Sequence, residues 1–180
     1  YGWFVAMTLF SFLALKRIVL LALFVTIVIA NLPRFLRFLS LNPVLVALAL
    51  LILISIGIDF SRGLYDQLII DYTGQSSNQF SMGRQDIWLR VLNALDFRHS
   101  DFLLWGQGFG SVTIALNETM KPIPDLLHND ILVLVLELGY LLSFVVLFLI
   151  LNVDNTNGRL LAVFLMFLFL SDNVIIYQHV

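Results

Sequence analysis

Long apolar stretches, separated by much shorter polar ones, dominate the chain. A helix that crosses a bilayer needs roughly 20 mostly apolar residues, and several stretches come near that length. We expect spans at residues 2–15 (only the end of a span), 18–32, 44–58, 131–151 and 160–177. Because these runs carry almost no charge, the pattern predicts an all-α integral membrane protein, built as a multi-span helical bundle.

The ends of the apolar runs divide the chain into three segments. Residues 1–58 hold the first spans, residues 59–130 form one long loop outside the membrane, and residues 131–180 hold two more spans. Lys16 and Arg17 interrupt the first apolar run after too few residues to cross a bilayer. The chain also starts with a tyrosine and stops at the end of a span, so we expect it to be part of a longer protein with further spans.

The composition narrows the class of protein. Hydrophobic residues make up 60% of the chain and charged residues only 12%, which excludes an ordinary soluble domain. A net charge of −2 is too small to favour a nucleic-acid partner. The chain has no cysteine, and His99, His128 and His179 lack the i, i+4 spacing of a helical zinc pair. We therefore predict no metal.

Charges in the short loops indicate an orientation. Arg34, Arg37 and Arg159 fall on one side of the membrane, which the positive-inside rule makes cytoplasmic. The long loop and the Lys16–Arg17 pair then lie on the other side. The long loop is therefore expected outside the cytoplasm.

The long loop carries two helical patterns. Apolar residues recur with helical spacing over residues 64–72 and again over residues 87–95, with polar residues between them. These patterns predict two amphipathic helices that lie along the membrane surface. Residues 73–83, which are rich in Gly, Ser, Asn and Gln, form a flexible link between them.

Candidate chemistry gathers where the long loop meets the span at 131–151. His128, Asn129 and Asp130 occur together at that point. His128 has three interpretations: a general base, a hydrogen-bond donor to phosphate, or part of a helix cap in which Asn129 or Asp130 is the N-cap residue. The residues alone favour the cap.

Other polar residues also stand out against the apolar background. Glu137 lies inside a span, where a carboxylate needs a partner or a proton. Lys16 and Arg17 are either functional cations or a simple turn with side chains that reach the headgroups. Arg84 can grip a phosphate with two hydrogen bonds, although a solvated arginine is the commoner case. His99 and His179 have no supporting pattern, and we interpret them as incidental.

The sequence from Gly106 to Gly110 contains three glycines at alternate positions. Their spacing does not match a dinucleotide-binding loop, and no strand–helix–strand unit surrounds them. A turn of this kind can expose backbone N–H groups to an anion. The favoured alternative is a loop that has to bend sharply beside the membrane.

In combination, these elements resemble one family, the O-antigen ligase/polymerase membrane proteins. The resemblance rests on motifs in the family's order: Leu15-Lys16-Arg17, Gly83-Arg84 followed by Trp88, the Gly106–Gly110 turn, and His128-Asn129-Asp130 with Glu137-Leu138-Gly139. It covers most of the chain and corresponds to about the C-terminal half of such a protein. The first basic motif reads Leu-Lys-Arg where Ser-Arg is commoner, so either Lys16 or Arg17 matches the family's arginine.

The resemblance implies a glycosyltransferase of bacterial surface polysaccharide. Such enzymes act at the periplasmic face of the inner membrane on glycans carried by undecaprenyl diphosphate, with a growing glycan or lipid A-core as acceptor. They need neither a metal nor a nucleotide sugar, and no other cofactor is expected. By this resemblance His128 and Arg84 are catalytic. The residues expected to bind substrate are Lys16, Arg17, Arg84, Asn129, Asp130 and Glu137.

Two other classes of function compete with this one. A transporter or flippase for a lipid-linked or anionic substrate can use the same arginines, but it needs discontinuous spans near the middle of the bilayer. The spans here show few internal Gly or Pro residues, which favours chemistry on one side of the membrane. A structural subunit leaves Lys16 and Arg17 unexplained.

Overall fold

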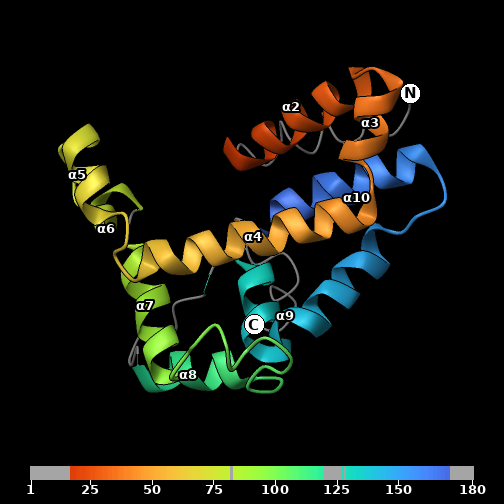
Figure 1. Ribbon diagram of the computed structural model, residues 1–180. Helices are drawn as coiled ribbons and strands as arrows, with labels where there is room; N and C mark the ends of the chain where they lie inside the picture. The colour runs from red at the N-terminus through yellow and green to blue at the C-terminus, as the bar shows by residue number, and fades with distance from the viewer. Residues whose placement is uncertain (1–16, 82, 120–126, 128, 171–180) are drawn as a thin grey trace.

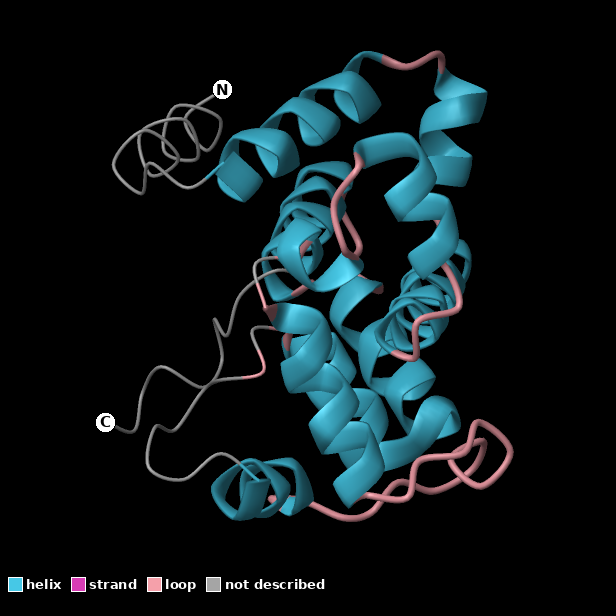
Figure 2. Cartoon of the chain, turned by 90° about the vertical axis from the view of Figure 1, so that its left-hand side faces the viewer, coloured by secondary structure: helices cyan, strands magenta, loops and turns pink. Residues whose placement is uncertain are grey.

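The computed structural model describes residues 17–81, 83–119, 127 and 129–170, and their regular structure is entirely helical (Figures 1 and 2). This confirms the predicted all-α class. The helices in chain order are α2 (Arg17–Asn31), α3 (Arg34–Ser40), α4 (Pro43–Ser61), α5 (Asp66–Thr73), α6 (Ser77–Phe80), α7 (Arg84–Ala94), α8 (Ser111–Thr119), α9 (Asp130–Leu151) and α10 (Thr156–Phe169).

Two of these helices, α4 and α9, are long and apolar enough to cross a membrane. The apolar helices α2 and α10 are shorter. One side of α4 is buried in the protein, whereas Leu48, Ile52 and Ile56 on its other side are 44%, 59% and 46% exposed. Large apolar side chains exposed along a helix favour lipid over water as the surroundings.

Asparagine side chains start each of the longer helices that follow α3. Asn42 accepts hydrogen bonds from the backbone N–H groups of Val44 and Leu45 at the start of α4, where Pro43 takes the first helical position. Asn129 does the same for α9 and Asn155 for α10. Each cap satisfies N–H groups that have no partner within the helix.

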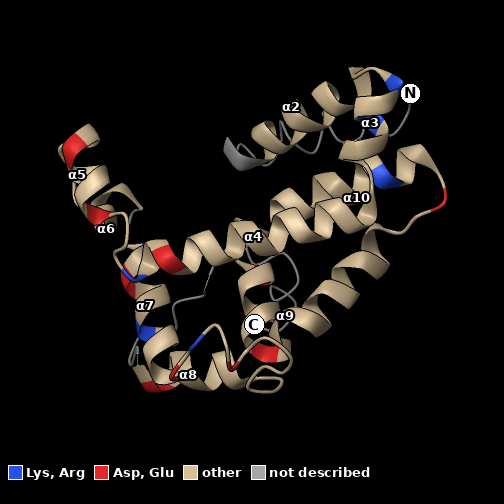
Figure 3. Cartoon of the chain, in the orientation of Figure 1, with Lys and Arg blue, Asp and Glu red and all other residues tan. Residues whose placement is uncertain are grey.

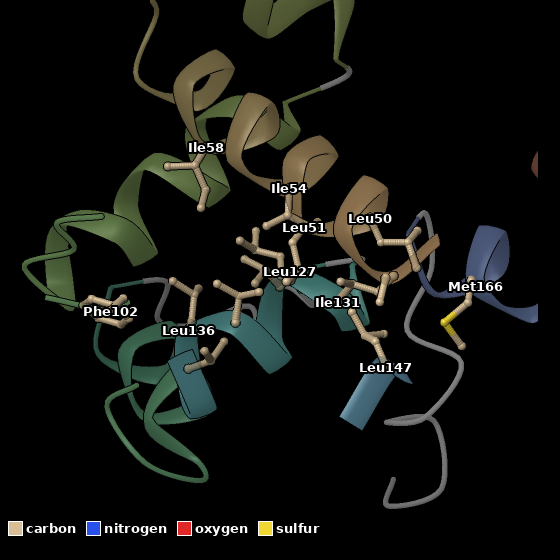
Figure 4. Close-up of a cluster of buried hydrophobic side chains, with 14 of the residues drawn as sticks. Leu50, Leu51, Ile54, Ile58, Phe102, Leu127, Ile131, Leu136, Leu147 and Met166 are labelled. Atoms are coloured by element: carbon tan, nitrogen blue, oxygen red, sulfur yellow. The ribbon is translucent and has the colours of Figure 1, made fainter. Parts of the chain in front are cut away.

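The main core lies between α4 and the first half of α9 (Figure 4). Leu51, Ile54 and Ile58 of α4 are almost completely buried against this half of α9. Its own buried residues include Ile131, Leu132, Val135 and Leu136. These β-branched and leucine side chains are all apolar and fill the interface.

Helix α9 is interrupted at Gly139, which has φ 81° and ψ 169°. In a continuous helix the N–H groups of Tyr140 and Leu141 would bond to the carbonyls of Leu136 and Glu137. Here all four groups bond to residues 102–108 instead. Tyr140 and Leu141 donate to the carbonyls of Phe102 and Leu103 at 2.9 and 3.1 Å, and the carbonyls of Leu136 and Glu137 accept from Gln107 and Gly108 at 3.0 and 2.9 Å.

Two glycines allow this close approach. A Cβ atom on Gly106 would lie 2.3 Å from the carbonyl carbon of Glu137, and one on Gly139 would lie 2.6 Å from that of Trp105. Both glycines are therefore required by contact between two backbones, and Gly139 is required by its φ angle as well. The apolar pattern predicted one span over residues 131–151. Helix α9 is long and apolar enough for that span, but the pattern did not indicate the interruption at Gly139.

The predicted amphipathic helices of the long segment correspond to α5 and α7. The apolar face of α7 packs on α4 and α8, with Val91 and Leu92 buried, so it is covered by protein and not left free for a membrane. Helix α5 buries none of its residues and projects from the other helices (Figure 1). The predicted flexible link at 73–83 contains α6, which starts with a capping box between Ser76 and Gln79.

We predict that Gly106→Ala lowers the free energy of unfolding by about 3 kcal/mol or more, because the new methyl group would push residues 102–108 away from α9. Thermal unfolding in detergent, followed by far-ultraviolet circular dichroism, should show a fall in Tm of about 6 °C or more. Gly74→Ala is the control, because Gly74 has φ 68° but no atom lies within 4 Å of the place that its new methyl group would take. That variant should lose only about 1–2 kcal/mol. Equal losses in the two variants would contradict a tight contact at Gly106.

Candidate active site at the start of α9

Trp88 of α7 links three elements at the start of α9. Its indole Nε1–H donates to the carbonyl of Leu127 at 2.9 Å. The same ring lies against Gly57 of α4, where an added Cβ would be 3.0 Å from the ring. Trp88 therefore holds the chain just before His128 against both α7 and α4.

The chain on the other side of His128 is fixed as well. Asn129 is 2% exposed, and its side-chain oxygen accepts from the N–H of Leu132 at 2.8 Å. Of the two caps that the sequence left open, Asn129 is the N-cap residue of α9, and Asp130 is its buried first residue. His128 itself lies outside the described residues, between two neighbours, Leu127 and Asn129, that are both almost completely buried.

Arg84 is the first residue of α7 and lies one helical turn before Trp88, on the same face of the helix. Its side chain is exposed, and no described residue forms a hydrogen bond or ion pair with it. The next residue, Gln85, is buried, and its Nε2 donates to the carbonyl of Phe60 and to Asp66 Oδ1 at 3.1 and 2.9 Å. Gln85 thus anchors the start of α7, while the guanidinium of Arg84 stays available.

The first basic motif is not brought to this site by any described contact. Arg17 opens α2, which packs along α10, and its side chain lies outside the described part of the chain. Lys16, Asp172 and His179 also lie outside the described residues. The expected role of Lys16 or Arg17 in substrate binding stays a prediction.

Glu137 and the Gly106–Gly110 turn contact each other. Glu137 Oε1 accepts from the backbone N–H of Gly110 at 3.0 Å, just before α8 begins. The turn's N–H groups at Gln107 and Gly108 are used by carbonyls of α9. The turn therefore binds a carboxylate, but it is the carboxylate of Glu137, which also suits the positive end of α8. Sharp bending, the favoured interpretation from the sequence, matches this geometry.

A polar cluster that the sequence did not indicate lies where α4 meets the second half of α9. Tyr140 OH is 3.0 Å from Ser55 Oγ and 3.1 Å from His99 Nδ1, and His99 Nε2 is 3.4 Å from Asp59 Oδ1. The side chains of His99 and Asp59 are 39% and 36% exposed. A carboxylate that orients an imidazole, in line with a phenol, can bind or relay a proton. His99 therefore has hydrogen-bond partners that its local sequence did not indicate.

One spacing in the sequence is compatible with part of this cluster, although it does not by itself indicate the cluster. Ser55 and Asp59 are four residues apart, so a helix places them on one face. Tyr140 follows the glycine at which α9 breaks, and His99 comes from a turn 41 residues earlier in the chain. Nothing in the local pattern around His99 indicates that pairing.

Among the described residues, no group of three or more His, Asp or Glu side chains lies close enough to hold a metal ion. Comparisons of the chain with protein-family models, with curated proteins and with solved structures find no match.

We predict that Trp88→Phe lowers the free energy of unfolding by about 1 kcal/mol, because phenylalanine keeps a ring beside Gly57 but leaves the carbonyl of Leu127 without its donor. The Tm, measured by far-ultraviolet circular dichroism, should fall by about 2–4 °C. Trp105→Phe is the matched control, because Trp105 is 68% exposed. The control should leave the Tm unchanged within about 1 °C. A similar fall in both variants would mean that the bond to Leu127 contributes nothing.

Proposed function

We propose that this protein is a glycosyltransferase of bacterial surface polysaccharide, of the O-antigen polymerase or ligase type. It transfers a glycan from undecaprenyl diphosphate to a growing glycan or to lipid A-core at the periplasmic face of the inner membrane. The observation that carries the proposal is the pair of anchors around His128. Trp88 holds Leu127, Asn129 caps α9, and α7 presents Arg84 on the same face as Trp88.

The reaction assigns separate tasks to Arg84 and His128. The acceptor hydroxyl oxygen attacks the anomeric carbon of the donor, and the bond from that carbon to the diphosphate oxygen breaks. The diphosphate leaves with the bonding electrons, and a fixed guanidinium stabilises the negative charge that builds on it. His128 takes the proton of the acceptor hydroxyl, and a positioned base of this kind contributes roughly 10²–10⁴-fold to the rate.

The fixed backbone around His128 suits this role. General-base catalysis requires the imidazole within hydrogen-bond reach of the acceptor hydroxyl. Leu127 and Asn129, on either side of His128, are both buried and hydrogen-bonded, and a held backbone at these two positions lowers the entropy cost of placing a catalytic group beside a substrate. The exposed guanidinium of Arg84 remains free for a ligand from outside the protein.

A transporter or flippase for a lipid-linked or anionic substrate is the second candidate, and the break in α9 is the observation that favours it. Discontinuous helices in transporters offer free backbone groups to ions or substrate. In this chain the carbonyls of Leu136 and Glu137 and the N–H groups of Tyr140 and Leu141 are already bonded to residues 102–108. The break therefore supports a structural joint more than an ion site, and glycosyl transfer remains the preferred function.

We predict that Arg84→Lys reduces glycan transfer by at least about tenfold although the charge is kept, because an ammonium group cannot form the two parallel hydrogen bonds of a guanidinium. The assay is polysaccharide formation from lipid-linked donor, normalised to the amount of protein in the membrane. Arg90→Lys is the control, since Arg90 is also exposed on α7 but lies elsewhere on the helix. Normal activity in Arg84→Lys would make Arg84 an ordinary surface cation.

We predict that His128→Ala and His128→Gln both lose about 10²–10⁴-fold in normalised transfer at unchanged protein level, because neither side chain can accept a proton near neutral pH. If His128 only orients the acceptor, glutamine should retain much more activity than alanine. His99→Gln is the comparison variant, and it should keep most of its activity. A loss confined to His99→Gln would move the base to the cluster around Tyr140, and normal activity in His128→Ala would exclude a direct role for His128.

Lipid-linked glycans from a deletion strain distinguish the two candidate functions. A lost transferase leaves undecaprenyl-diphosphate glycan in the periplasmic leaflet, whereas a lost flippase leaves it in the cytoplasmic leaflet. Accumulation in the cytoplasmic leaflet would contradict glycosyl transfer.

A further inference from the structure

Another polar site, separate from the cluster around Tyr140, lies at the opposite ends of α4 and α9 from the candidate active site. Three arginines, Arg34 and Arg37 of α3 and Arg159 of α10, surround one cavity of about 240 Å³. Phe38, Leu41 and Thr156 complete its lining. Figure 3 shows the basic residues of α3 and α10 together at this end of the molecule. In the sequence these arginines served only to indicate the orientation of the chain.

Hydrogen bonds hold two of the arginines in place, but no described carboxylate neutralises the charge of any of the three. A terminal nitrogen of Arg37 donates to the carbonyl of Leu32 at 2.9 Å, and Nε of Arg159 donates to the carbonyl of Val153 at 2.7 Å. These bonds use one donor on each side chain and leave most of the five N–H groups of each guanidinium. Within the part of the chain that the structure describes, none of the three arginines forms an ion pair with a carboxylate.

The unbalanced charge favours an anion in the cavity. Three guanidinium groups around a small space repel one another. The Nε atom of Arg37 is out of contact with water and has no described hydrogen-bond partner, so water screens this repulsion less than it would at an open surface. The cavity also lies at the N-terminus of α10, where Thr156 begins the helix and the helix dipole is positive. Phosphate oxygens match both features, since arginine binds phosphate with paired hydrogen bonds.

The surroundings of the cavity are those of a lipid headgroup. Phe35 and Phe38 of α3 are 70% and 61% exposed beside the arginines. Helix α4 starts at Pro43 and α9 ends at Leu151, so the cavity lies at one end of both helices that are long enough to cross a bilayer. Exposed phenylalanine side chains offer a dissolved phosphate ion no favourable contact. A phospholipid carries its phosphate next to its own acyl chains, which can contact Phe35 and Phe38 while the phosphate contacts the arginines.

A second, apolar cavity of about 400 Å³ lies on the other side of α3. Its lining includes Leu39 and Ser40 of α3, between Phe38 and Leu41, which line the cavity with the arginines. The apolar cavity is bounded by α2, α4 and α10 as well, for example at Ile29, Ala49 and Met166. Its volume falls within the range of ligand pockets, about 300–1,000 Å³, and its lining suits an acyl chain.

We propose that Arg34, Arg37 and Arg159 bind the phosphate of an anionic phospholipid, with one acyl chain of that lipid in the apolar cavity behind α3. The bound lipid neutralises the arginine cluster and joins α3 to the start of α10. The proposal requires that α4 and α9 cross a membrane, but it does not depend on glycosyl transfer. A result that contradicts the lipid site therefore leaves the proposed glycosyl transfer unaffected, and the reverse is also true.

The test measures the Tm of the purified protein in detergent with added lipid, by far-ultraviolet circular dichroism. Dioleoyl phosphatidylglycerol at about 100 times its Kd should raise the Tm by about 5 °C or more. Dioleoyl phosphatidylcholine, which has no net charge, should raise it by less than about 1 °C. Inorganic phosphate and glycerol 3-phosphate at the same concentration should leave it unchanged.

Paired variants identify the site. Arg34→Gln/Arg159→Gln should abolish the shift caused by phosphatidylglycerol, and Arg90→Gln/Arg98→Gln, which removes the same charge from exposed positions elsewhere, should keep it. If the double variant does not fold, Arg34→Gln alone, at an exposed side chain, should still weaken the shift caused by phosphatidylglycerol. An equal shift with both lipids, an equal shift with inorganic phosphate, or a shift that survives Arg34→Gln/Arg159→Gln would overturn the proposal.

Discussion

The backbone of α9 is interrupted at Gly139, and residues 102–108 fill the interruption. Four backbone groups that a helix would have paired internally bond to this segment instead, at 2.9–3.1 Å. A polar backbone group buried without a partner is costly, and more so in lipid, where water cannot replace the bond. The two halves of α9 and the segment at 102–108 therefore form one unit, and neither can take this conformation alone. Residues 102–108 are held against α9 by this contact.

Both groups of candidate functional residues depend on that unit. The first half of α9 packs on α4 and presents Asn129 and the chain around His128 to Trp88. The second half begins with Tyr140, which joins Ser55 of α4 to His99. If α9 were continuous, Tyr140 would turn with the helix and the cluster would lose its central hydroxyl. The interruption thus sets the direction of both halves, and with it the positions of Asn129 and Tyr140 relative to each other.

The sequence predicted the residues at the start of α7 and α9 better than the contacts that distant parts of the chain make with each other. Asparagine before an apolar run is a local capping signal, so Asn129 could be named as a cap candidate from three consecutive residues. Arg84 stands out in the sequence because a guanidinium can grip a phosphate, and in the structure it is the first residue of α7. His99 was dismissed because its partners come from α4 and α9, far away in the chain. The sequence indicates the glycine turn, but not that Glu137, one of the expected substrate-binding residues, accepts a hydrogen bond from Gly110, because nothing local links the two residues.

Hydrophobic periodicity and composition by themselves determined that the described chain is helical, that α4 and α9 are long and apolar enough to cross a bilayer, and where several helices begin. These properties depend on residues within about one or two helical turns of each other, so a single sequence carries them. Only the tertiary structure decided that α9 is broken, that α7 is covered by α4 and α8, and that three loop arginines share one cavity. Each of these outcomes depends on how closely two distant backbones or charges approach. That distance is set by the packing of the whole molecule. A local sequence pattern describes only one of the two segments that come into contact.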